Sequence, residues 1–166
     1  MLRHAKAASQ GPDDHGRALT ARGRRQAAAV GGYVAGASVR GALAPALVLS
    51  SSARRAVETA EIVAAALDPP VELVVERALY SADVDDAVEI VRGLVDDAAS
   101  VMVVGHNPTM HELALGLLDA RDTAGRARLE GGFPTAALAV TAVPTDSWAR
   151  VTLGSATLLA LHTPDS

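Results

Sequence analysis

The stretch VMVVGHNP, at residues 101–108, decides how this chain is expected to fold. Residues 101–104 are all apolar, and a short run of this kind is typical of a central strand buried on both faces. Asn107 is suited to cap a helix that starts just after it, with Pro108 at the first helical position. Apolar residues then recur at helical spacing, as Met110, Leu113, Ala114, Leu117 and Leu118. A strand followed at once by a helix indicates a βα unit.

The same alternation continues outward in both directions. Further strands are predicted at 47–49 and 71–75, and helices at 19–35, after Ser52 up to the Pro69-Pro70 stop, and at 83–97. Two looser apolar stretches, 136–143 and 151–161, are interpreted as late strands, and 119–132 as a flexible loop rich in Arg, Asp and Gly. The pattern predicts an α/β fold with a mainly parallel sheet and helices on both faces. Neither a linker nor a repeat divides residues 1–166, so one domain is expected.

The amino-acid composition disfavours several classes of function. A formal net charge of −4 disfavours binding to nucleic acid or an anionic membrane. The absence of cysteine excludes disulfides, thiolate metal sites and a cysteine nucleophile. No apolar run approaches the roughly 20 residues of a membrane span, and charge begins at Arg3, so a cytoplasmic protein without a secretory leader is expected. The histidines and carboxylates show no metal-ligand spacing, which predicts no metal and no cofactor.

Three polar clusters directly follow strand-like runs: Arg3-His4, residues 50–55, and Gly105-His106. Ligands of such sheets bind beyond the carboxyl ends of the strands, so one shared site is expected there. Arginine offers a planar fork of donors that matches phosphate oxygens, and neutral imidazole is a competent nucleophile toward phosphorus. The clusters are therefore compatible with phosphoryl chemistry, but by themselves they do not favour it over ordinary strand-end histidines and surface arginines.

Five ordered segments sharpen this interpretation. Residues 2–6 read LRHAK, residues 14–23 DHGRALTARG, residues 51–60 SSARRAVETA, residues 79–80 LY, and residues 104–108 VGHNP. Together they resemble the signature of the SixA-type phosphohistidine phosphatases, a branch of the histidine phosphatase (phosphoglycerate-mutase-like) superfamily, except that Ser52 stands where proline is usual. The resemblance implies a three-layer α/β/α fold and a phosphatase that needs no metal.

The resemblance also implies roles for individual residues. His4 would be the nucleophile that is transiently phosphorylated, Arg3 and Arg55 would bind the phosphoryl oxygens, and His106 would stabilise charge in the transition state. Arg17 would either reach the substrate or pin the loop after the first strand, with the structural role favoured. The adjacent Arg54 is expected in solvent, and His15, His111 and His162 are expected to be solvated or packing residues.

Two departures from the family pattern bear on function. Only Met1 and Leu2 precede Arg3, so the opening strand is expected to be short and His4 less firmly held. No carboxylic acid stands in a decisive motif to protonate a leaving group. Glu76, which ends the 71–75 strand, is the preferred candidate, with Asp83, Asp85 and Asp86 as alternatives.

Three functions remain open at this point. A site without an evident acid suits protein phosphohistidine, because protonated phosphoramidates release neutral imidazole without further help. A small-molecule phosphomonoesterase with Glu76 or a nearby Asp as acid is the alternative. A degenerate phosphate-binding module is the third. The expected partner is accordingly a phosphorylated protein or a small phosphorylated metabolite.

Overall fold

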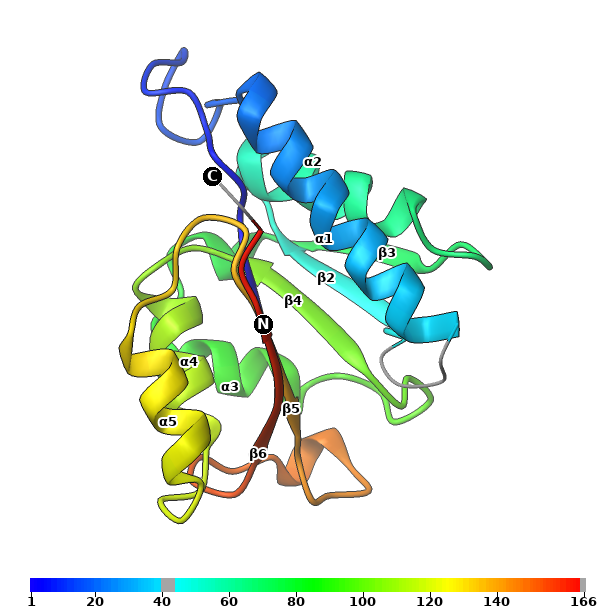
Figure 1. Cartoon of the computed structure of the whole chain (residues 1–166), viewed down its shortest axis with the longest axis vertical. Coiled ribbons are helices and arrows are strands. Elements are labelled where there is room, and N and C mark those ends of the chain that lie inside the picture. The colour runs from blue at the N-terminus through cyan, green and yellow to red at the C-terminus, as the bar shows by residue number, and fades with distance from the viewer. Residues whose placement is uncertain (40–43, 165–166) are drawn as a thin grey trace.

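A computed structural model describes residues 1–39 and 44–164, in which strands and helices alternate along most of the chain (Figure 1). The strands are β1 (Leu2–Arg3), β2 (Leu47–Ser51), β3 (Glu72–Glu76), β4 (Val101–Gly105), β5 (Leu138–Ala142) and β6 (Thr157–His162). The helices are α1 (Ala21–Val39), α2 (Arg54–Ala65), α3 (Val84–Arg92), α4 (Thr109–Leu117) and α5 (Thr123–Glu130), with short 3-10 turns η1 (Arg77–Tyr80) and η2 (Trp148–Arg150). None of these helices is both long and apolar enough to span a bilayer.

The six strands form one sheet in the order β3-β2-β4-β1-β5-β6. Strands β1 to β4 are parallel, as predicted, whereas β5 and β6 pair in antiparallel fashion at one edge. The carboxyl ends of β2 and β4 therefore point toward the same edge, at the top of Figure 1, where the loop before α1 also lies. This edge is where the three polar clusters meet.

Two hydrophobic cores lie on opposite faces of the sheet. Successive strand residues point to opposite faces, so Val103 packs with α3 and α4 whereas Val104 packs with α1 and α2. The side chains are mainly Ala, Val and Leu, each Val or Leu contributing about 1.5–3 kcal/mol when fully buried. The resulting α/β/α sandwich holds the strand ends rigidly.

Strand β1 is only two residues long, yet its position in the sheet compensates for its length. It pairs with β4 on one side and β5 on the other, and Leu2 is fully buried. The hydrogen bonds continue past the strand, because His4 N–H donates to Gly105 O (2.9 Å) and His4 O accepts from Ala136 N–H (3.2 Å). Lateral pairing therefore fixes the backbone of His4, and the expectation of a loosely held His4 is wrong.

Helix α1 begins against the chain that leaves β1. The Thr20 hydroxyl donates to Lys6 O and accepts from Gly23 N–H, both at 3.0 Å. A Cβ at Gly23 would collide with that same Lys6 carbonyl oxygen. The first turn of α1 therefore lies very close to the segment just beyond His4, and the Thr-x-x-Gly spacing permits this close approach.

The loop predicted at 119–132 is wrong, because it contains helix α5. The Asp122 carboxylate accepts from Gly125 N–H at 2.9 Å and caps this helix, and also accepts from Leu158 N–H of β6 at 2.8 Å. Leu129 is fully buried in the core. One capping residue and one buried leucine are enough to anchor eight residues that look merely polar in sequence.

Two helix boundaries also differ from expectation. Helix α3 ends at Arg92, with Gly93 as its C-cap, rather than continuing to residue 97. Helix α4 starts at Thr109, with Pro108 at the N-cap position and no side-chain cap. The Asn107 amide instead donates to Phe133 O at 2.9 Å. Asn107 therefore links two loops at the carboxyl edge of the sheet, and its predicted capping role is wrong.

Candidate active site

His4 follows β1 at the carboxyl edge of the sheet. Its Nδ1 lies 2.8 Å from the carbonyl oxygen of Ala5. A carbonyl oxygen only accepts, so Nδ1 carries the ring proton and the lone pair is on Nε2. This arrangement leaves Nε2 unprotonated and fixes the orientation of the ring.

His106 follows the neighbouring strand β4. Its ring centroid lies 5.2 Å from that of His4, and its Nε2 lies 2.8 Å from Ser51 Oγ at the end of β2. Three adjacent strands thus contribute His4, Ser51 and His106 to one place. The predicted pairing of the two histidines at one sheet edge is what the structure contains.

Both histidines are electrically neutral at pH 7. Burial lowers the pKa of His4 from 6.5 to about 4, and the cations Arg55 and Arg3 act in the same direction, against the bond to Ala5. Burial also lowers the pKa of His106 to about 3, helped by His4 and Arg55. A neutral imidazole keeps its lone pair, which a nucleophile requires.

Arg55 lies in the first turn of α2, with its side chain almost entirely buried. Its Nη1 donates to Asp14 O (2.6 Å) and its Nη2 to the Asp14 carboxylate (3.0 Å). Thr59 secures this turn, since its hydroxyl donates to Arg55 O at 2.6 Å and accepts from Ala5 N–H at 3.0 Å. The adjacent Arg54 is exposed, as predicted, and pairs with Glu58 at 2.7 Å.

Arg3 completes the cationic group from within β1. Its Nη1 donates to Phe133 O at 2.9 Å, the same oxygen that accepts from Asn107. Buried nitrogen atoms of Arg3 (Nε), Arg55 (Nε) and His106 (Nδ1) have no hydrogen-bond partner among residues 1–39 and 44–164. A donor-rich cluster of this composition suits a tetrahedral dianion.

Asp14 contacts the site residue Arg55, and the DHGRALTARG segment alone indicated no role for it. Its carboxylate accepts from Arg17, from Arg55 and from the Tyr80 hydroxyl (2.9 Å). The bond from Arg17, followed by that from Tyr80, lowers the pKa of Asp14 to about 2. Asp14 therefore stays ionised and orients Arg55, and the Asp-x-x-Arg spacing was the available signal.

Arg17 takes the structural role that was favoured for it. Besides its two bonds to Asp14, it donates from Nη1 to Ala8 O at 3.0 Å. These contacts span the loop between β1 and α1 and close it on itself. Arg17 also contributes positive potential at His4 and lowers that pKa.

Each of the three remaining histidines contacts another side chain. His15 Nε2 lies 3.0 Å from Ser52 Oγ, and its ring stands edge-on to Tyr80, which in turn stands edge-on to His106. His15 thus belongs to the rim of the site. His111 stacks on Phe133, and His162 stacks on Tyr33.

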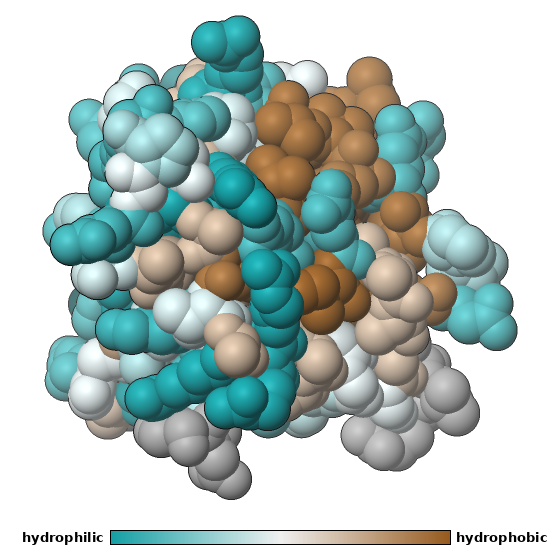
Figure 2. Space-filling view, turned by 90° about the horizontal axis from the view of Figure 1, so that it is seen from above, coloured by the Kyte–Doolittle hydropathy of each residue, from teal (hydrophilic) through white to brown (hydrophobic). Residues whose placement is uncertain are grey.

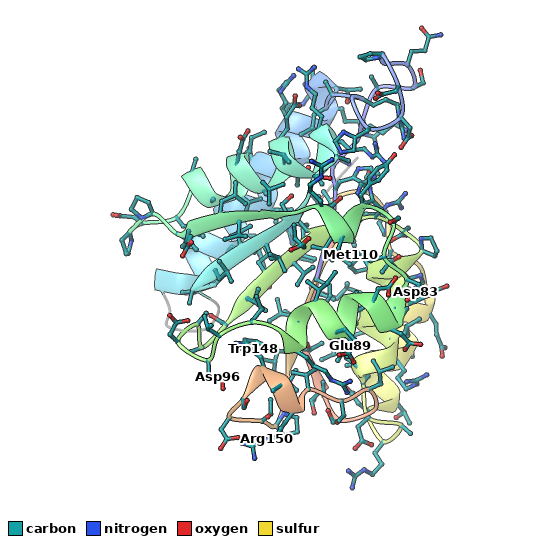
Figure 3. All side chains as sticks on the ribbon, turned by 180° about the vertical axis from the view of Figure 1, so that it is seen from behind. Asp83, Glu89, Asp96, Met110, Trp148 and Arg150 are labelled. Atoms are coloured by element: carbon teal, nitrogen blue, oxygen red, sulfur yellow. The ribbon has the colours of Figure 1, made fainter. Side chains whose placement is uncertain are left out.

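The candidate acids are engaged in capping. Glu76 lies at the carboxyl end of the edge strand β3, and its carboxylate accepts from Ala78 N–H (2.8 Å) at the start of η1. Asp83 and Asp86 form a capping box at the start of α3, where Figure 3 labels Asp83. Asp85 lies exposed in the first turn of the same helix. Within the described residues, no three His, Asp or Glu side chains gather as metal ligands.

The depressed histidine pKa values give a direct prediction. In an NMR titration, the ring protons of His4 and His106 should shift with midpoints near pH 4 and 3, not near 6.5. Unfolded histidines protonate near pH 6.5, so the unfolded state binds more protons as the pH falls from 6.5 to 4. The free energy of unfolding should decline over that window.

His4→Gln and His106→Gln variants would assign the two resonances and should each flatten that decline. A His4 midpoint close to 6.5 would show instead that its ring is solvated and cationic at mildly acidic pH.

Comparison with known proteins identifies the family. The sequence model for the histidine phosphatase superfamily (branch 1) matches residues 1–86. The chain is 36% identical to the uncharacterized protein Rv1276c of Mycobacterium tuberculosis over 168 residues, covering 98% of this chain and 99% of that protein. The chain belongs to the histidine phosphatase superfamily.

Solved structures of this superfamily match over nearly the whole length. A structure ascribed to the phosphohistidine phosphatase SixA of Nakamurella multipartitia superposes with a TM-score of 0.82 at 30% identity, covering 99% of this chain and 94% of that one. A protein histidine phosphatase SixA solved with tungstate gives 0.75 at 24% identity, with 96% and 92% covered, which speaks for the fold alone. Both the expected superfamily and its three-layer fold are confirmed. Members of this superfamily are phosphatases or mutases, which supports an enzymatic activity of this chain.

Proposed function

We propose that this superfamily member removes phosphoryl groups from phosphohistidine in proteins, through a covalent intermediate at His4 and without a metal. The observation that carries the proposal is the Nδ1 contact of His4 with Ala5 O (2.8 Å), which leaves Nε2 unprotonated among Arg3, Arg55 and His106. The likeness to the SixA structure of Nakamurella supports the substrate class.

The reaction consists of two displacements at phosphorus. In the first, the Nε2 lone pair of His4 forms a P–N bond as the bond from phosphorus to the leaving imidazole breaks. In the second, water attacks the phosphohistidine, the bond to Nε2 breaks, and inorganic phosphate departs. Arg3 and Arg55 neutralise the equatorial oxygens in both steps, which is most of what phosphoryl transfer asks of a protein.

The leaving group favours phosphohistidine over an alkyl ester. An alkoxide needs a proton while its bond breaks, and the carboxylate in contact with the catalytic arginine, Asp14, has a pKa near 2 and is ionised. A protonated phosphoramidate leaves as neutral imidazole and needs no such acid. The electrostatics of the site therefore support the activated donor.

A second candidate function, a small-molecule phosphomonoesterase, rests on the position of Glu76. Ser51 pairs with Glu76 in the β2–β3 register, so the Glu76 carboxylate lies at the catalytic edge, one strand from Ser51. Release from its capping bond to Ala78 would free it to protonate an alkoxide. Glu76 is therefore the acid to test.

The deciding experiment compares kcat/KM for phosphohistidine peptides, an aryl phosphate and an alkyl phosphate, with and without chelator, in wild type and Glu76→Gln. The proposal predicts that the phosphohistidine peptide is the best substrate and the alkyl phosphate by far the worst. Glu76→Gln should change no rate by more than about twofold, and chelator none. General acid catalysis contributes about 10²–10⁴-fold.

A selective loss of that size on the alkyl ester alone would establish Glu76 as the acid and favour the metabolite function. Glu72→Gln serves as the matched control, because Glu72 is an exposed glutamate at the opposite end of the same strand and is not a candidate acid.

A further inference from the structure

Three cationic side chains beside the active site have no ionic or hydrogen-bonded partner within residues 1–39 and 44–164. These are Lys6, two residues after His4, and Arg22 and Arg25 in the first turns of α1, all exposed. Their neighbours differ, because Arg24 and Arg54 both pair with Glu58. The chain carries a net charge of −4, so this unneutralised positive cluster stands out against its overall charge.

Hydrogen bonds place the cluster next to His4. Thr20 N–H donates to Lys6 O (2.9 Å), and the Gln26 side-chain oxygen accepts from Lys6 N–H (3.1 Å). The same oxygen accepts from the Thr135 hydroxyl, in the loop that returns to His4 through Ala136. Gln26 is thereby buried as the link between α1 and the segments on either side of the nucleophile.

A groove of about 500 Å³ lies along this face of α1, lined by Arg22, Arg25, Gln26, Ala29 and the chain near Thr163. Arg22 and Arg25 are three residues apart, and positions three or four apart share a helix face, so both guanidinium groups line the same wall. Seen from above, this end of the molecule has a largely hydrophilic part and a separate hydrophobic part (Figure 2).

We propose that this cationic groove docks an acidic segment of the protein that carries the phosphohistidine. The inference rests on the proposed function and specifies which proteins are good substrates. An extended chain spans at most about 3.3–3.6 Å per residue, so carboxylates two to four positions from the phosphohistidine would lie within about 7–14 Å of it, and we propose that they meet Lys6, Arg22 and Arg25. The groove selects such partners by charge and speeds their encounter.

The experiment uses two peptides that carry one phosphohistidine each. The first has Asp or Glu at positions two to four on both sides, and the second has Asn or Gln at those positions. Wild-type kcat/KM should be roughly tenfold higher for the acidic peptide at low salt, as expected for two or three exposed charge pairs. The ratio should fall toward one at high salt, because exposed charges are screened.

Arg22→Gln/Arg25→Gln should reduce this ratio to about two or below, since only Lys6 remains. The matched control is Arg121→Gln/Arg150→Gln, which removes the same two charges from exposed positions, with Arg150 at the opposite end of the molecule (Figure 3). The control should keep the wild-type ratio.

Equal kcat/KM for both peptides in wild type, or an unchanged ratio in the α1 variant, would overturn the docking proposal while leaving the proposed function intact. Failure of wild type to hydrolyse either peptide would overturn both.

Discussion

His4→Ala is expected to lower kcat/KM by at least about 10⁴-fold, since loss of a covalent nucleophile removes the reaction path itself. Burial keeps this imidazole neutral, and the bond to Ala5 O orients it. The measurement is turnover of an aryl phosphate, together with rapid-quench trapping using labelled substrate. Wild type should yield a phosphoenzyme that is labile in acid and stable in base, as a P–N bond is.

Ser51 makes this trapping experiment informative. Its Oγ lies 2.8 Å from His106 Nε2, which is the spacing of a serine activated by a histidine base. A phosphoserine would be stable in acid, so the two nucleophiles leave opposite chemical signatures. Label that persists in His4→Ala, and disappears in Ser51→Ala, would refute the assignment of His4.

Arg55→Ala should reduce kcat/KM by roughly 10²–10³-fold, the size of effect seen when one donor to transition-state charge is removed. The same substitution removes a buried guanidinium together with its two hydrogen bonds to Asp14, and should lower the free energy of unfolding by about 1–3 kcal/mol. Denaturant unfolding and steady-state kinetics measure the two losses separately.

Arg54→Ala is the control for this variant. It removes the same charge from the adjacent position of the same helix, but Arg54 is exposed and pairs only with Glu58. Its kcat/KM should stay within about twofold of wild type. An equal loss of kcat/KM in both variants would mean that Arg55 acts only through its positive charge and not through direct contact with the phosphoryl group.

Much of the fold was predictable because apolar runs and polar clusters alternate so regularly. The runs at 47–49, 71–75 and 101–104 all lie in parallel strands, since each is short, mainly apolar and followed by residues that start a helix or turn. The histidine and arginine motifs came to the same sheet edge because parallel strands place their carboxyl ends there. The parallel order of the strands is thus the main reason why these residues lie together.

The features that the sequence did not predict depend on contacts between distant segments. Asn107 bonds to Phe133 O instead of capping α4, and nothing near residue 107 encodes that choice. Helix α5 depends on Leu129 reaching a core formed by other elements. Asp14 is half of an ion pair whose partner, Arg55, lies 41 residues away. Local patterns carry little information of this kind.

The close approach of Gly23 to the Lys6 carbonyl has a consequence for protein engineering. A methyl group added there would have to push α1 away from the segment that leaves β1, only two residues beyond the nucleophile. That position holds no reactive atom, yet any side chain there would displace backbone that lies close to His4 in sequence. A library built to retune this enzyme should leave Gly23 fixed and vary the exposed positions of the same helix.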